Sequence, residues 1–153
     1  MIAVVGPGAL HADPDVLRNA ERVGELLAQA GHDVVTGGLD GVMEAASRGA
    51  KNAGGKVLAL LPGSDRTDAT PYADIVIPTG VGQARNVLVV RAADAVIAVG
   101  GSWGTLSEVA IAMRLAKPVV WLRGWQVKGA EEEVPTAASP EQAVAWVVAA
   151  PHS

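Results

Sequence analysis

The sequence predicts an α/β protein, a doubly wound parallel sheet within a single domain. Short apolar segments rich in β-branched residues alternate with segments of helical periodicity along the chain. Glycine or proline separates most of these segments, and the 18 glycines suit the tight turns between strands and helices. Half of the residues are hydrophobic but only 3% are aromatic, so Ala, Val, Leu and Ile must build the core. A length of 153 residues predicts one domain, residues 1–153.

Capping and breaking residues predict where each element begins and ends. Asp13-Pro14 starts the first helix, because aspartate caps a first turn and proline fits within it, and Gly31 ends that helix. Continuous apolar runs predict strands that are buried on both faces. In chain order we expect a strand at 1–5, a helix at 13–30, strands at 32–36 and 57–61 around a helix that ends near 54, a strand at 75–77, a helix at 84–93, a strand at 95–99, a helix ending near 116, a strand at 119–122 and a final helix after Ser139.

Composition excludes several classes of function. The net charge is −4 and the basic residues are scattered, which argues against a nucleic-acid partner. The absence of cysteine excludes disulfides, zinc fingers and cysteine nucleophiles. No apolar run approaches the ~20 residues that span a bilayer, and the chain enters a strand without a leader segment, so we expect a cytoplasmic protein with no membrane partner.

The loop after the first strand lacks the fingerprint of Rossmann dinucleotide domains. Gly6-Pro7-Gly8 supplies two glycines, but residues 9–11 bring no third glycine. His11 in this loop is either a ligand contact or a surface residue. We therefore expect a Rossmann-like sheet that holds no cofactor, and no metal site.

Residues 95–108 carry the strongest functional signal. A buried strand runs into glycines and then into a helical pattern. This arrangement binds anions, because glycines allow close backbone approach and the first helical N–H groups lack internal partners. Gly37-Gly38 also follows a strand and opens a helix, so it belongs at the same sheet edge. The candidate phosphate- and ligand-binding residues are Gly37, Gly38, Gly100, Gly101, Ser102, Trp103, Gly104 and Thr105.

The roles of three side chains near this loop each have more than one interpretation. Trp103 stacks on a base or pterin, packs at a subunit interface, or merely covers the loop. Arg85 opposes the dipole of the helix that it opens, which indicates an anionic partner, either a phosphate or Glu108; the alternative is a solvated surface arginine. Glu108 suits a ribose hydroxyl or a developing positive charge, or else it is the capping-box partner of Thr105.

Residues 100–108 resemble the Pro-Gly-Gly-x-Gly-Thr-x-x-Glu signature of the Lonely Guy (LOG) family, formerly labelled lysine decarboxylases. Gly100 replaces the proline and Ser102 the second glycine. Arg85-Asn86 lies where that family has Arg-Lys, and residues 36–44 resemble its glycine-rich turn. The resemblance extends to about residue 120 and is strongest with the short branch that includes molybdenum-cofactor carrier proteins.

The resemblance implies a phosphoribohydrolase, which cleaves a nucleoside 5′-monophosphate, with Arg85 and Glu108 as the catalytic residues. The missing lysine, proline and second glycine favour the alternative, a non-catalytic carrier or sensor of a phosphorylated ligand such as molybdenum cofactor. Both predict a small phosphorylated partner, a nucleoside monophosphate or a pterin-type molecule. Nothing resembles a pyridoxal-phosphate lysine site, so lysine decarboxylation is not expected. The resemblance also implies a homodimer or higher homo-oligomer; the apolar helix segments 87–90 and 106–113 supply its interface or belong wholly to the core.

Overall fold

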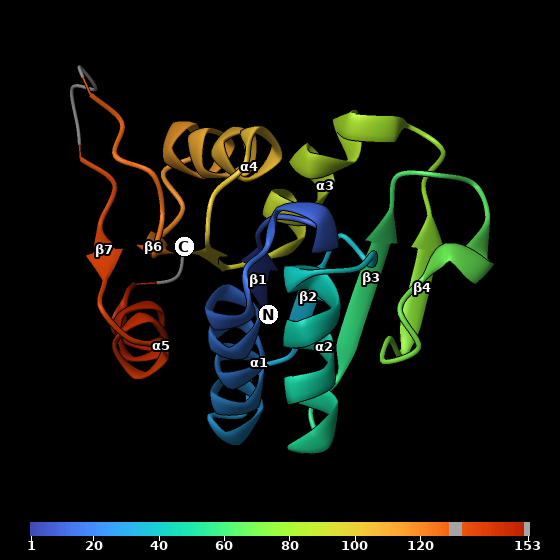
Figure 1. Ribbon diagram of the computed structural model, residues 1–153, viewed down its shortest axis with the longest axis horizontal. Coiled ribbons are helices and arrows are strands. Elements are labelled where there is room, and N and C mark those ends of the chain that lie inside the picture. The colour runs from blue at the N-terminus through green and yellow to red at the C-terminus, as the bar shows by residue number, and fades with distance from the viewer. Residues whose placement is uncertain (129–132, 152–153) are drawn as a thin grey trace.

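The chain folds around a parallel sheet, which confirms the predicted fold class (Figure 1). The computed structural model describes residues 1–128 and 133–151. Within them the sheet has seven strands in the order β4-β3-β2-β1-β5-β6-β7, and every neighbouring pair is parallel. The strands are β1 (Ile2–Val5), β2 (Val34–Thr36), β3 (Val57–Leu61), β4 (Ile75–Pro78), β5 (Ala95–Val99), β6 (Val119–Leu122) and β7 (Thr136–Ala137).

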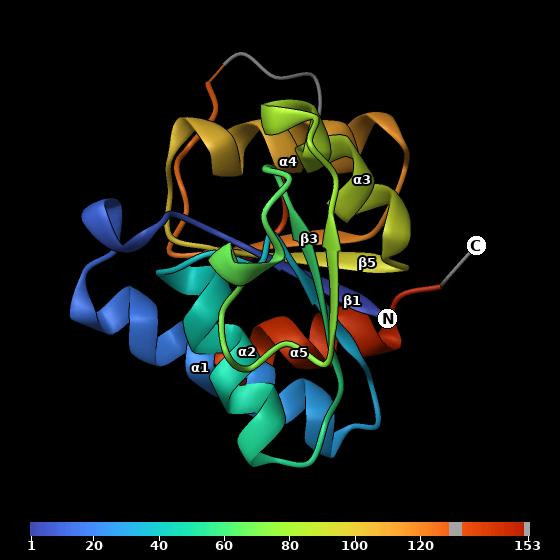
Figure 2. The same ribbon diagram turned by 90° about the vertical axis from the view of Figure 1, so that its right-hand side faces the viewer.

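Helices cover both faces of the sheet and bury two apolar clusters. Figure 2 shows α1, α2 and α5 on one face and α3 and α4 on the other. In β1, Ile2 and Val4 belong to the first cluster, whereas Ala3 and Val5 belong to the second. This two-sided burial explains the continuous apolar runs of the strands. The helices are α1 (Pro14–Gln29), α2 (Val42–Asn52), α3 (Arg85–Ala92), α4 (Trp103–Arg114) and α5 (Pro140–Ala149).

The strand order reverses between β1 and β5, which are neighbours in the sheet. Ile2 pairs with Ala95 and Val5 with Ala98. After β1 the chain winds outward through β2, β3 and β4, and after β5 it winds the opposite way through β6 and β7. The chain leaves β1 for α1 on one face and β5 for α4 on the other. Parallel sheets bind ligands in the crevice that such a switch point leaves at the carboxyl ends of the strands.

The structure adds short elements that the sequence did not predict. β7 has two residues, too few to produce an apolar run, and the described part of the chain has three 3₁₀ turns, at Ala9–His11, Arg66–Asp68 and Gly82–Ala84. Ile75 and Ile77 are 59% and 45% exposed, because β4 is an edge strand and α3 packs on β1, β2 and β3. Among the described residues no helix is long and apolar enough to cross a membrane.

Candidate functional site

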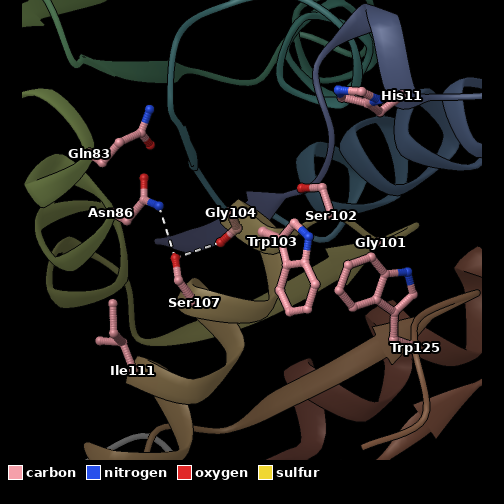
Figure 3. A pocket seen from close by; sticks show the side chains of 10 residues that line it. All are labelled: His11, Gln83, Asn86, Gly101, Ser102, Trp103, Gly104, Ser107, Ile111 and Trp125. Carbon is pink, nitrogen blue, oxygen red and sulfur yellow. Dashed lines mark hydrogen bonds between the residues drawn. The ribbon is translucent and has the colours of Figure 1, made fainter.

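A cavity of about 1000 Å³ opens where β1 and β5 end (Figure 3). Its walls come from the turn after β1, the start of α3, the β5–α4 loop, the exposed face of α4 and the segment after β6. The lining residues are His11, Gln83, Asn86, Gly101, Ser102, Trp103, Gly104, Ser107, Ile111 and Trp125. The lining is therefore largely polar and aromatic, and His11 is the only ionisable side chain among these ten residues.

Gly100 gives the β5–α4 loop a conformation that a proline cannot adopt. Its φ angle is +71°, whereas the proline ring holds φ near −65°. The amide of Gly100 donates to Leu122 O at 2.9 Å, and the buried Trp121 Nε1 donates to Gly100 O at 2.6 Å. Glycine therefore replaces the proline of the Lonely Guy signature in a loop that two hydrogen bonds hold against β6.

Ser102 is the N-cap of α4. Its hydroxyl accepts from Thr105 N at 3.2 Å and lies 2.9 Å from the Thr105 hydroxyl. Thr105 is buried, and with Ser102 as the cap, Glu108 lies in the second helical turn. The alternative in which Glu108 closes a capping box on Thr105 is therefore wrong. The backbone N–H groups of Trp103 and Gly104 are the first of the helix and have no helical acceptor, so they remain available to an anion.

Two tryptophans form one wall of the cavity. The rings of Trp103 and Trp125 meet edge to face, with centroids 5.1 Å apart and an interplanar angle of 83°. The indole of Trp125 fills the space where a Cβ on Gly101 would stand, so the close approach requires glycine there. Trp103 is 79% exposed. An aromatic-poor chain thus presents two of its four tryptophans to this cavity.

Arg85 and Glu108 are buried close to each other and are not among the residues that line the cavity. Arg85 is 5% exposed and Glu108 6%, so Arg85 is not the solvated surface arginine of the alternative interpretation. The guanidinium occupies the place of a Cβ on Gly37, and Met43 Sδ lies 2.7 Å from that same point. Among the described residues, Arg85 Nε is the buried side-chain nitrogen that has no hydrogen-bond partner.

Burial dominates the ionisation of this pair. Desolvation raises the pKa of Glu108 to about 8, and the positive charge of Arg85 opposes that rise. Desolvation also lowers the pKa of Arg85, against the influence of Glu108. Each charge acts on the other through space without a hydrogen bond between them. A carboxyl in this state is largely protonated at neutral pH.

Asn86 connects α3 to α4 at the floor of the cavity. Its Nδ2 donates to Ser107 Oγ at 3.0 Å, and Ser107 Oγ donates to Gly104 O at 2.6 Å (Figure 3). Asn86 is 7% exposed, whereas Ser107 is half-buried and Gly104 is exposed, so this chain of hydrogen bonds runs from the protein interior toward the solvent. It links the start of α3 to the first turn of α4, where the free N–H groups lie.

The structure divides the predicted site residues into two sets. The cavity lining contains Gly101, Ser102, Trp103 and Gly104, and their binding role stays a prediction. The other predicted residues are buried and do not line the cavity: Gly37, Gly38, Arg85, Gly100, Thr105 and Glu108. Sequence reasoning missed Gln83, Asn86, Ser107, Ile111 and Trp125 as lining residues. Ser107 and Ile111 follow Trp103 at intervals of four, a spacing that predicts a shared helix face.

Comparisons with known proteins agree with this architecture. The model of the SLOG cluster4 family matches residues 1–151. An uncharacterised protein of Archaeoglobus fulgidus is 48% identical over 122 residues, which cover 80% of this chain and 79% of that protein. The structure of the molybdenum cofactor binding protein from Rippkaea orientalis matches with a TM-score of 0.89 and 41% identity, covering 96% of this chain and 94% of that one. The molybdenum cofactor carrier protein of Chlamydomonas reinhardtii matches with a TM-score of 0.88 and 35% identity, over 96% and 94% of the two chains.

Proposed function

This chain belongs to the SLOG cluster4 family, and we propose that it is a carrier that binds a small phosphorylated pterin-type ligand without cleaving it. The molybdenum cofactor, a pterin that bears a phosphate, is the ligand that this proposal favours. Two similar structures are described as a binding protein and a carrier protein for that cofactor. Their likeness extends over 96% of this chain.

One observation carries the non-catalytic part of the proposal: the carboxylate and the arginine that catalysis would need are not in the cavity lining. Cleavage of an N-glycosidic bond builds positive charge on the ribose, and a catalytic carboxylate has to meet that charge. Glu108 is 6% exposed, and the ten lining residues include no carboxylate. The lining thus supplies groups for binding but no carboxylate to stabilise an oxocarbenium ion.

The cavity has separate features for the two ends of such a ligand. The free N–H groups of Trp103 and Gly104 suit the phosphate, because backbone donors at a helix N-terminus attract anions without a basic side chain. The exposed ring of Trp103 suits a flat heterocycle. This division allows a protein of net charge −4 to hold a phosphorylated molecule.

A phosphoribohydrolase is the second candidate, and the pKa of Glu108 favours it. A carboxyl with a pKa of about 8 holds its proton at neutral pH, as a general acid must. For this function the Glu108 side chain would have to reach the substrate, which requires movement of α4 or of the loop before it.

Two measurements on the same preparation separate the candidates. Protein mixed with molybdenum cofactor released from a heat-denatured molybdoenzyme is desalted, and the retained pterin is oxidised and quantified by fluorescence. We expect near-stoichiometric retention. Protein incubated with AMP is analysed by chromatography for adenine, and we expect none. Adenine release that disappears in Glu108→Ala would overturn the carrier proposal in favour of the hydrolase.

A further inference from the structure

We propose that Asn86 determines which heterocycle the cavity accepts: its amide oxygen takes a hydrogen bond from an exocyclic amino group of the ligand. This inference rests on the proposed function, since it assumes that a phosphorylated heterocycle enters the cavity. It adds the recognised chemical group, the 2-amino group that pterins and guanine share.

The hydrogen bonds around Ser107 determine how the Asn86 amide is turned. Gly104 O can only accept a hydrogen bond, so the Ser107 hydroxyl donates its one proton to that carbonyl oxygen, with 2.6 Å between the two oxygens. Ser107 Oγ must then accept from Asn86, and only the amide nitrogen can donate, at 3.0 Å. The Asn86 oxygen is therefore turned away from Ser107.

The Asn86 oxygen is left as an acceptor at the cavity. Figure 3 shows it pointing away from Ser107, on the side where Gln83 lies. Among the described residues no group donates a hydrogen bond to it, although Asn86 is 7% exposed and lines the cavity. This oxygen is not among the fully buried polar atoms that lack a partner, so it is open to the cavity, where a ligand N–H can replace water as its donor.

The position of Asn86 suits one edge of a ring that stacks on α4. Trp103, Ser107 and Ile111 follow one another at four-residue intervals and all line the cavity, so they share one helix face. Asn86 bonds to Ser107, the middle residue of that face, one turn from the exposed ring of Trp103. A planar ring over this face brings its polar edge to Asn86. A lysine, the residue of the Lonely Guy signature at this position, offers only donors and would repel an amino group.

The test compares GMP, which carries the 2-amino group, with IMP, which is identical except that it lacks this group. Binding is measured by calorimetry for the intact protein, Asn86→Leu, Asn86→Asp and a control, Asn52→Leu, at the exposed end of α2. One hydrogen bond predicts that the intact protein and Asn52→Leu bind GMP about fivefold to tenfold more tightly than IMP. Asn86→Leu should bind both equally. Asn86→Asp keeps the acceptor and should keep the preference.

Each other outcome has a separate meaning. Equal binding of GMP and IMP by the intact protein, or a preference that survives in Asn86→Leu, would overturn the role of Asn86 and leave the proposed function standing. Ribose 5-phosphate serves as a probe that has the phosphate but no ring. If the intact protein binds none of the three compounds, the role of Asn86 fails, and the retention of molybdenum cofactor measured separately decides the proposed function.

Discussion

At Gly37 a missing side chain makes room for the guanidinium of Arg85. Motif comparison singled out both residues, yet it placed Gly37 in a phosphate-binding turn and not under an arginine. The two residues are far apart along the chain, and a contact between the turn after β2 and the start of α3 produces no periodic pattern in the sequence. The sequence thus predicted that both residues belong to the site, but it did not predict that the Arg85 guanidinium packs against Gly37.

Gly37→Ala is expected to lower the free energy of unfolding by about 1–3 kcal/mol, because the new methyl group overlaps Arg85. Urea unfolding at neutral pH measures the loss. In an Arg85→Ala background the same substitution should cost clearly less, since the guanidinium is gone. Equal costs in the two backgrounds would show that Arg85 does not occupy this space.

Glu108 should make the protein less stable as pH rises. Its pKa is about 8 in the folded protein and 4.5 as a free side chain, so between these values the folded state holds a proton that the unfolded chain has lost. The contribution of Glu108 to stability is therefore complete below pH 4.5 and declines as pH approaches 8, by an amount on the order of a few kcal/mol.

Glu108→Gln removes this titration, and the difference between the two proteins isolates it from all other groups. Unfolding free energies at about pH 5 and about pH 8 should fall more steeply for the intact protein than for the variant. Parallel pH dependences would contradict a buried, protonated Glu108.

At the scale of elements, the helix α4 was predicted from the sequence, but its N-cap residue was not. The apolar periodicity and the glycines before it indicated a strand, a turn and a helix, all of which occur. One alternative placed the cap at Thr105, but Ser102 holds it, because two hydroxyl residues three positions apart both suit a cap and only the backbone decides between them. Trp125 was missed because it lies in an irregular segment without periodicity.

Ser102→Ala should destabilise the protein by about 1 kcal/mol through loss of the cap and also weaken retention of a phosphorylated ligand. Ser139 caps α5 in the same way, with its hydroxyl accepting from Gln142 N at 3.2 Å, but α5 covers the opposite face of the sheet. Ser139→Ala is thus a matched control, expected to lose similar stability in thermal unfolding with no change in retention. If both variants retain the ligand equally well, the cap of α4 does not contribute to ligand binding and this prediction is wrong.

For the whole molecule, the alternation of elements predicted the parallel sheet, and the apolar run 95–99 predicted a strand buried on both faces, which is β5, a neighbour of the middle strand β1. The expected oligomer depends on which apolar residues of the helices are exposed, and the sequence periodicity did not distinguish exposed from buried positions. Val89 and Val90 are fully buried in the core, whereas Val87 and Leu88 are 38% and 42% exposed. Segment 87–90 thus contributes two residues to the core and leaves two apolar residues exposed on the surface.

We propose a homodimer that covers the exposed apolar positions of α3. Size exclusion with light scattering should give twice the chain mass for the intact protein, and Leu88→Asp should give a monomer, because a charge in a buried interface lacks a partner. Val148→Asp, at a 41% exposed position of α5, is the control and should remain a dimer. A monomer at micromolar concentration would contradict the proposal.

The most direct test of the carrier function compares two substitutions at Gly104. The Cβ of an alanine there would lie 3.8 Å from its nearest neighbour, Ser102 Oγ, so side chains fit. Aspartate in a first helical turn favours the helix dipole, and the fold should tolerate it. Its carboxylate would, however, face the expected phosphate, and like charges in contact cost several kcal/mol.

Retention of released molybdenum cofactor should therefore be nearly unchanged in Gly104→Ala and at least about tenfold weaker in Gly104→Asp. That result would place the phosphate at the N-terminus of α4. Undiminished retention by Gly104→Asp would contradict the account, because the ligand would then bind somewhere other than this loop.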